Sequence, residues 1–179
     1  TYDNAGNLVQ KKGDGQKTLY SYNESNQLET ISNMSLANEE SGAYGCYSRY
    51  SYEYSLDGSR VKETDIVGNT TEYSYDKAGR LTKENVTEGV NTSWMEYTYD
   101  ARGNRVSKYT SADDITVDYT YDLNNRLTEE TWTDEYYDGD YYYDVNHWRS
   151  YTYDNNGNVL SKTEEKVEFP RVGDDVAII

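Results

Sequence analysis

The sequence predicts an all-β protein, a strongly curved antiparallel meander of repeated β-hairpins. The main observation is a Tyr-Asp signature, or a close variant, that recurs seven times in 179 residues. Each copy is followed about four residues later by Gly or Asn and then by Leu or Val. A second set of turn-forming residues separates successive copies, so each period contains two turns and two antiparallel strands.

The spacing of the copies indicates an array of small units. The second tyrosine of each copy lies at Tyr2, Tyr22, Tyr54, Tyr75, Tyr99, Tyr121 and Tyr153, so the steps are 20, 32, 21, 24, 22 and 32 residues. We therefore predict a repeat array over residues 1–162, with insertions at 31–49 and 133–150. Residues 163–179 would form a tail or a linker. Because the chain starts inside a repeat, we expect it to be a piece of a longer protein.

Residues 71–83 show how one copy should fold. Tyr73 and Tyr75 alternate with polar residues, a period of two that is typical of a strand with one aromatic face. Asp76 suits the first position of a type I turn, because its carboxylate can accept hydrogen bonds from backbone N–H groups ahead of it. Gly79 then suits the left-handed residue of a three-residue hairpin loop. Aromatic side chains of this kind should line the concave face of the sheet.

The same reading assigns the repeat-defining residues of the other copies. The turn would begin at Asp3, Asp76, Asp100, Asp122 and Asp154, and the left-handed or glycine position would hold Gly6, Asn26, Gly79, Gly103, Asn125 and Gly157. In the short-looped copies Tyr2 should pair with Leu8, Tyr22 with Leu28, Tyr75 with Leu81 and Tyr121 with Leu127. Three copies are expected to have one extra loop residue, which pairs Tyr54 with Val61, Tyr99 with Val106 and Tyr153 with Leu160. Exposed ion pairs are predicted for Asp76–Arg80, Asp122–Arg126 and Asp100–Arg105.

Composition limits the classes of partner. The chain has 17 basic and 33 acidic residues, a net charge of −16, which disfavours binding to a phosphate backbone. The sequence contains no run of about 20 apolar residues, so no membrane insertion by a helix is predicted. We expect no nucleic-acid partner and no cofactor.

Few residues suggest catalysis or metal binding. The only cysteine and the only histidine, Cys46 and His147, fall in different insertions. A partly buried thiol and a surface-loop imidazole are the favoured alternative to a Cys–His pair. We therefore predict no enzymatic activity. The second insertion clusters carboxylates, which permits either a calcium site or a solvated acidic hairpin, and the second is favoured. The candidate calcium ligands are Asp134, Asp138, Asp140 and Asp144.

The unit Tyr-x-Tyr-Asp-x-x-Gly-Arg-Leu resembles the YD repeat of the Rhs family, which includes bacterial Rhs and wall-associated proteins, the C-components of Tc toxins and the animal teneurins. The resemblance covers residues 1–162 and is strong at 73–81, 97–106, 119–127 and 151–160. It implies a spiral of hairpins that wraps into a hollow shell, which in bacterial members encloses a C-terminal toxin. The partners implied are the rest of the parent shell and the enclosed toxin domain, in a protein that is secreted or displayed on the cell surface.

Two other functions remain open at this point. Aromatic hairpins of this length also occur in modules that bind carbohydrate or cell-wall glycan, although the chain has only three tryptophans. An adhesion scaffold is the other alternative. Because a cut repeat array exposes unpaired strands at its ends, self-association through those edges is also predicted.

Overall fold

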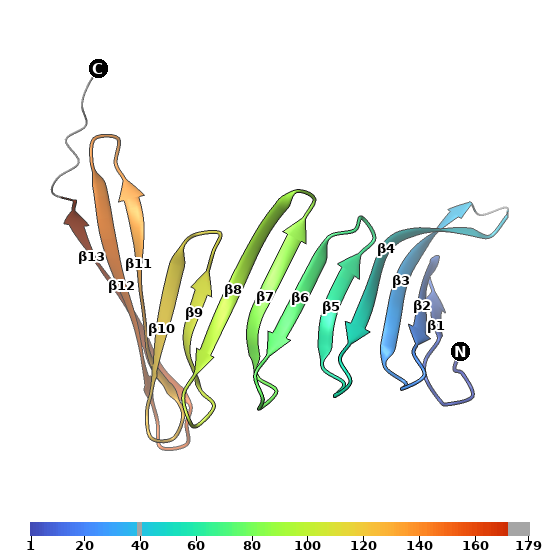
Figure 1. Cartoon of the computed structure of the whole chain (residues 1–179), viewed down its shortest axis with the longest axis horizontal. Coiled ribbons are helices and arrows are strands. Elements are labelled where there is room, and N and C mark those ends of the chain that lie inside the picture. Colours follow the sequence, from blue (N-terminus) through green and yellow to red (C-terminus); the bar gives the residue numbers. More distant parts are fainter. Residues whose placement is uncertain (39–40, 172–179) are drawn as a thin grey trace. The chain divides into compact units, whose positions relative to one another are not determined.

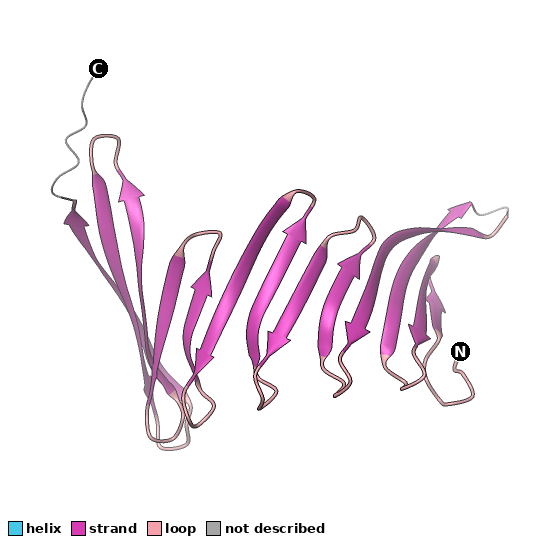
Figure 2. Ribbon diagram, in the orientation of Figure 1, coloured by secondary structure: helices cyan, strands magenta, loops and turns pink. Residues whose placement is uncertain are grey.

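The computed structural model describes residues 1–38 and 41–171. Within these ranges the chain contains strands joined by short turns and no helix (Figure 2). It therefore has no helical segment there that could cross a bilayer. The all-β fold and the antiparallel hairpin meander predicted from the sequence are confirmed.

The chain divides into two compact units, Thr1–Trp94 and Met95–Ile179. Strand order follows the sequence, and each strand is antiparallel to its paired neighbour (Figure 1). The first unit contains β1 (Gln10–Gly13), β2 (Gln16–Tyr22), β3 (Leu28–Asn38), β4 (Ala43–Tyr54), β5 (Arg60–Asp65), β6 (Thr70–Tyr75), β7 (Leu81–Glu88) and the start of β8 (Asn91–Tyr99). The second contains the end of β8 with β9 (Arg105–Thr110), β10 (Ile115–Tyr121), β11 (Leu127–Tyr137), β12 (Tyr142–Tyr153) and β13 (Val159–Pro170).

Burial in both units is limited. Among the described residues only Tyr97, Val145 and Ser32 are buried, and no side chain there is enclosed completely. In each unit the extensive contacts are between strands that are neighbours in the sequence. Both faces of a sheet built this way remain accessible, and its stability comes from pairing and from contacts along each face.

The insertions and the tail extend the strands. The 31–49 insertion contributes to β3 and β4, although residues 39–40 lie outside the described part of the chain. The 133–150 insertion lengthens the β11–β12 hairpin, whose register runs from Glu129–Ser150 to Tyr137–Tyr142. Residues 163–170 continue β13, and 172–179 lie outside the described residues. The division into an array and a tail stays a prediction.

Candidate functional site

The repeated turn has the geometry that the Tyr-Asp signature predicts. Asp76 Oδ1 accepts hydrogen bonds from the backbone N–H groups of Ala78 (2.8 Å) and Arg80 (3.0 Å), and its carbonyl accepts from the N–H of Gly79 (3.0 Å). Gly79 has a φ of 77°. Arg80 Nε donates to Asp76 Oδ2 at 2.7 Å, which confirms the predicted ion pair. One carboxylate therefore organises the whole loop.

Asparagine replaces arginine at the end of several of these turns. Asn7, Asn104 and Asn158 each donate a side-chain N–H to the Oδ2 atom of the aspartate four residues earlier, at 3.1, 2.9 and 2.9 Å. Asp65 starts a further turn of the same kind, closed by Asn69 at 2.8 Å, although no tyrosine precedes it. The signature is therefore a property of the loop and does not require the Tyr-x-Tyr strand.

The prediction of one extra loop residue in three copies is wrong. Every copy pairs its tyrosine with the residue six positions later: Tyr2–Leu8, Tyr22–Leu28, Tyr54–Arg60, Tyr75–Leu81, Tyr99–Arg105, Tyr121–Leu127 and Tyr153–Val159. The partners of three tyrosines are thus Arg60, Arg105 and Val159, and the predicted partners Val61, Val106 and Leu160 lie one residue further along. The hydrogen bonds of the turn set the loop length and therefore the register. The position of the nearest apolar residue does not set it.

The corrected register also changes one predicted ion pair. Arg126 Nε lies 2.7 Å from Asp122 Oδ2, as expected. In the copy that begins at Asp100, however, Asn104 stands at the position of Arg126 and donates to the carboxylate. Arg105 is the strand residue opposite Tyr99, and the pair expected for Asp100 with Arg105 is replaced by the Asn104 contact.

Hydrogen bonding favours the charged form of the turn aspartates. The backbone N–H of Arg80 lowers the pKa of Asp76, against a smaller opposing effect of burial, and Arg126 does the same for Asp122. For Asp154 the side chain of Asn158 contributes most to the lowered pKa. A carboxylate that accepts several N–H groups holds its proton less tightly than a free one, so these turns are strongest when the aspartates are ionised.

The second tyrosine of a repeat donates its hydroxyl to the backbone of the preceding repeat. We call these contacts the tyrosine ladder: Tyr22 to Leu8 O (3.0 Å), Tyr54 to Leu28 O (2.8 Å), Tyr75 to Arg60 O (2.7 Å), Tyr121 to Arg105 O (2.8 Å) and Tyr153 to Leu127 O (2.7 Å). Each acceptor is the residue that pairs with the second tyrosine of the preceding copy, just after its turn. Burial raises the pKa of Tyr121, which keeps its hydroxyl protonated and able to donate. Within each unit, these five contacts tie a repeat to the one before it.

Arginines fill the gap between the first tyrosines of neighbouring copies. The Arg60 guanidinium lies 5.3 Å from the ring centre of Tyr52 and 4.9 Å from that of Tyr73. In the second unit Arg105 lies 5.5 Å from Tyr97 and 4.9 Å from Tyr119. A guanidinium between two aromatic faces gains cation–π attraction from both. Arginine can therefore replace leucine opposite the repeat tyrosine.

Asparagine at the left-handed position adds a contact that glycine cannot make. Asn26 has a φ of 58° and accepts a hydrogen bond from Asn7 Nδ2 at 3.0 Å, through its side-chain oxygen. Asn125 has a φ of 61° and accepts from Asn104 Nδ2 at 3.0 Å. These two contacts link successive turns to each other. An asparagine at the end of one turn, followed by an asparagine at the left-handed position of the next, is the sequence signal for such a link, as in Asn7 and Asn26.

Three of the four candidate calcium ligands have carboxylates with partners of their own. Asp134 lies 3.0 Å from His147 Nε2, Asp138 accepts from the backbone N–H groups of Asp140 and Tyr141, and Asp144 pairs with Arg171 at 2.7 Å. In the described part of the chain no three His, Cys, Asp or Glu side chains are placed to hold a metal ion. The structure therefore gives the calcium alternative no support.

Cys46 and His147 belong to different units. Cys46 is half-buried and its thiol donates to the carbonyl of Ser48 at 3.4 Å. His147 is stacked on Trp132, with ring centres 4.7 Å apart and an interplanar angle of 3°. Arg149 lies over the same indole at 5.1 Å, and its pKa is raised by hydrogen bonds to Glu164 and Glu130. Each group thus has local partners of its own.

These features define a class of protein, an array of β-hairpin repeats built from Tyr-Asp turns. The family model described as RHS Repeat matches residues 54–92 and 99–131. Two segments of the chain therefore match the Rhs repeat, which confirms the resemblance seen in the sequence.

A solved structure shares the fold. The chain is similar to a chain of the Tc holotoxin pore of Photorhabdus luminescens, in a mutant form, with a TM-score of 0.73 and 21% identity. The match covers 95% of this chain and 9% of that one. A protein of unknown function from Bacteroides fragilis NCTC 9343 has a TM-score of 0.24 and 13% identity over 86% of this chain and 94% of its own, which is too low to bear on the fold. No curated protein matches the sequence.

Proposed function

We propose that this chain is a non-catalytic wall segment of a larger secreted or surface-displayed bacterial protein, and that the complete wall encloses a C-terminal toxin until delivery. The observation that carries the proposal is the tyrosine ladder. It uses the hydroxyl of the repeat tyrosine to join successive hairpins, and it can be continued for as many repeats as the parent contains. The similarity in fold to part of a Tc holotoxin pore supports the same function.

The accessible faces and edges of the sheet also support a wall. A sheet of this length needs something against its aromatic face, because few of its side chains are buried within the chain itself. β13 is exposed along its whole length and forms one end of the strand order. The next part of the parent shell would pair with this edge. Self-association of the isolated segment through the same edge stays a prediction.

The experiment uses the full-length parent protein. Limited proteolysis would be followed by mass spectrometry of the C-terminal region, in the parent and in the region produced alone. We expect the region to be protected many-fold within the parent and to lose that protection when Tyr75→Phe and Tyr121→Phe together weaken the ladder. Equal digestion in the parent and in the separate region would contradict enclosure.

The non-catalytic assignment has its own control. The variants Cys46→Ala and His147→Ala remove the two side chains most suited to nucleophilic chemistry. Toxicity of the parent should be unchanged in both, after correction for the amount of folded protein. A loss of toxicity without loss of folding would show that the wall contributes chemistry.

A further inference from the structure

We propose that the second unit carries a binding site for a neutral pyranose glycan, on the sheet face opposite the repeat tyrosines and centred on Trp148. Three residues form a row across three strands: Asp118 on β10 pairs with Thr131 on β11, which pairs with Trp148 on β12. Thr116 and Asn146 lie two residues before Asp118 and Trp148 on the same strands, so they share this face. We call these five residues the Trp148 face.

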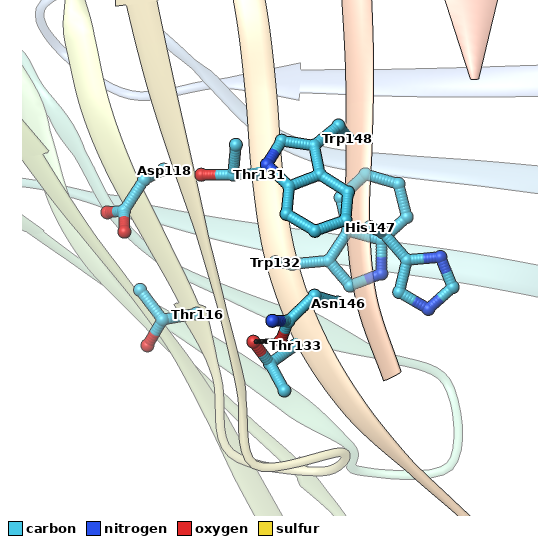
Figure 3. Close-up of a pocket in the computed structure, with 8 residues that line it drawn as sticks. All are labelled: Thr116, Asp118, Thr131, Trp132, Thr133, Asn146, His147 and Trp148. Atoms are coloured by element: carbon cyan, nitrogen blue, oxygen red, sulfur yellow. Dashed lines mark hydrogen bonds between the residues drawn. The ribbon is translucent and has the colours of Figure 1, made fainter. Parts of the chain in front are cut away.

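The Trp148 face lines an open cavity of about 470 Å³ (Figure 3). Its lining also includes Trp132, His147 and Thr133, and Thr133 donates to Asn146 Oδ1 at 2.8 Å. Neighbouring strands are about 4.8 Å apart, so the three strands span roughly 10 Å. This volume lies within the range of about 300–1,000 Å³ that is usual for small-ligand sites, and the open form suits a chain molecule.

The polar groups of this face are free. Among the described residues, no hydrogen-bond partner is found for the side chains of Thr116, Asp118, Thr131 or Trp148, and the amide N–H₂ of Asn146 has none. This differs from the turn aspartates, each of which accepts several hydrogen bonds. A carboxylate, two hydroxyls, an amide and an indole N–H thus converge on one cavity with their capacity unused.

The ligand class follows from this combination. A pyranose ring has an apolar face of C–H groups and a rim of hydroxyls, so it can stack on the half-buried Trp148 indole and turn its hydroxyls to the polar groups. Asp118 and the net charge of −16 disfavour phosphate groups and acidic sugars. Trp132 and His147 occupy the alternate positions on β11 and β12, on the opposite face, and are stacked on each other. Both residues also line the cavity, but each ring has its stacking partner in the other.

The tyrosine side of the hairpins is less suitable for the same task. There the hydroxyls of the second tyrosines already donate to backbone carbonyls, and arginines stand between the rings of the first ones. A glycan on that side would have to displace contacts that hold the repeats together. The proposed site therefore concerns one face of one unit, and it is independent of whether the parent encloses a toxin.

The test measures binding of neutral hexasaccharides to this chain. The probes are cellohexaose, maltohexaose and hexa-N-acetylchitohexaose. Their binding is measured by calorimetry and by the change in the NMR signal of the Trp148 indole N–H. We expect at least one probe to bind with a dissociation constant of about 1 mM or tighter and to shift that signal. No saturable binding of any of the three would overturn the proposal.

Matched variants locate the site. Trp148→Ala should weaken binding at least tenfold, and Asp118→Ala about threefold to tenfold, as expected for one lost hydrogen bond. Trp94→Ala, which changes a tryptophan of the other unit, is the control and should bind as the unchanged chain does. Equal binding by Trp148→Ala and the unchanged chain would overturn the proposal. If Trp148→Ala does not fold, Trp148→Phe and Asn146→Ala provide the same comparison.

Discussion

The hairpin Tyr121–Leu127 and the Trp148 face lie in the same unit and use polar side chains in opposite ways. In the hairpin, Asp122 accepts from Asn124 N, Arg126 N and Arg126 Nε, and the Tyr121 hydroxyl donates to a carbonyl. On the Trp148 face the carboxylate of Asp118 and the hydroxyl of Thr131 have no partner among the described residues. Paired groups hold a chain together, whereas unpaired groups remain available for a ligand. The first region therefore carries structure and the second is the better candidate for recognition.

The largest difference between the face of the repeat tyrosines and the Trp148 face should appear when an aromatic ring is removed. Tyr97 is only 9% exposed and its ring lies against Arg105. Tyr97→Ala should lower the free energy of unfolding by about 3 kcal/mol, as for other large-to-small changes at buried sites. Trp148→Ala, on the open face, should cost about 1 kcal/mol or less. Urea unfolding followed by circular dichroism measures both, and equal losses would show that the two faces are not different in kind.

A smaller effect is expected at the left-handed position of a turn. Gly79→Val places a β-branched side chain at a φ of 77°, which should cost about 1–3 kcal/mol of unfolding free energy. Space is not the cause, because a Cβ atom at Gly79 would meet no neighbour within 4 Å. Ala78→Val, one residue earlier, is the control and should change stability little. If the two variants unfold at the same urea concentration, backbone conformation is not what the turn requires.

The tyrosine ladder should contribute less per contact than the turn glycine. Tyr121→Phe keeps the ring and removes the hydrogen bond to Arg105 O, so it should cost about 1 kcal/mol. Tyr141→Phe changes a tyrosine that is 64% exposed, at the tip of the β11–β12 hairpin, and should have no measurable effect. The measurement is the free energy of unfolding of the two variants. If the tyrosine ladder does not stabilise the fold, Tyr121→Phe will be as stable as Tyr141→Phe.

The smallest effect at neutral pH is expected for the turn carboxylate itself. The pKa of Asp122 is lowered in the folded chain, so its contribution is present above the unfolded pKa and is lost as pH falls through the folded one. Stability should thus decline below about pH 4, where carboxyl groups begin to take up protons. Asp122→Asn should keep the turn at pH 7, because Asn23 already fills this position and accepts from Ser25 and Gln27 at 3.0 Å each.

The acid dependence of Asp122→Asn tests the sign of this linkage. The variant should lose less stability than the unchanged chain between pH 7 and pH 3, since one titrating group is gone. Thermal midpoints at several pH values measure the difference. A steeper acid loss in Asp122→Asn would mean that the carboxylate is not stabilised by folding.

Much of the repeat could be predicted from local chemistry. The Asp turn, the left-handed positions and the antiparallel pairs of the short-looped copies all follow from residues that are near one another in the chain. The error arose where the apolar residues Val61, Val106 and Leu160 were used to set register. Aligning the turns instead, with Asn104 and Asn158 at the position of Arg80, would have given one loop length for every copy.

The sequence by itself determined the strands that flank the Tyr-Asp turns, where each of those turns begins and which residue of the turn has a positive φ. These are local properties, and a carboxylate or a glycine imposes them within a few residues. Only the tertiary structure decided that Tyr121 reaches Arg105 O, that Arg60 lies between Tyr52 and Tyr73, and that Asp118 and Trp148 share one face. Those contacts join residues 8 to 30 positions apart, and they exist only once pairing has placed neighbouring strands side by side.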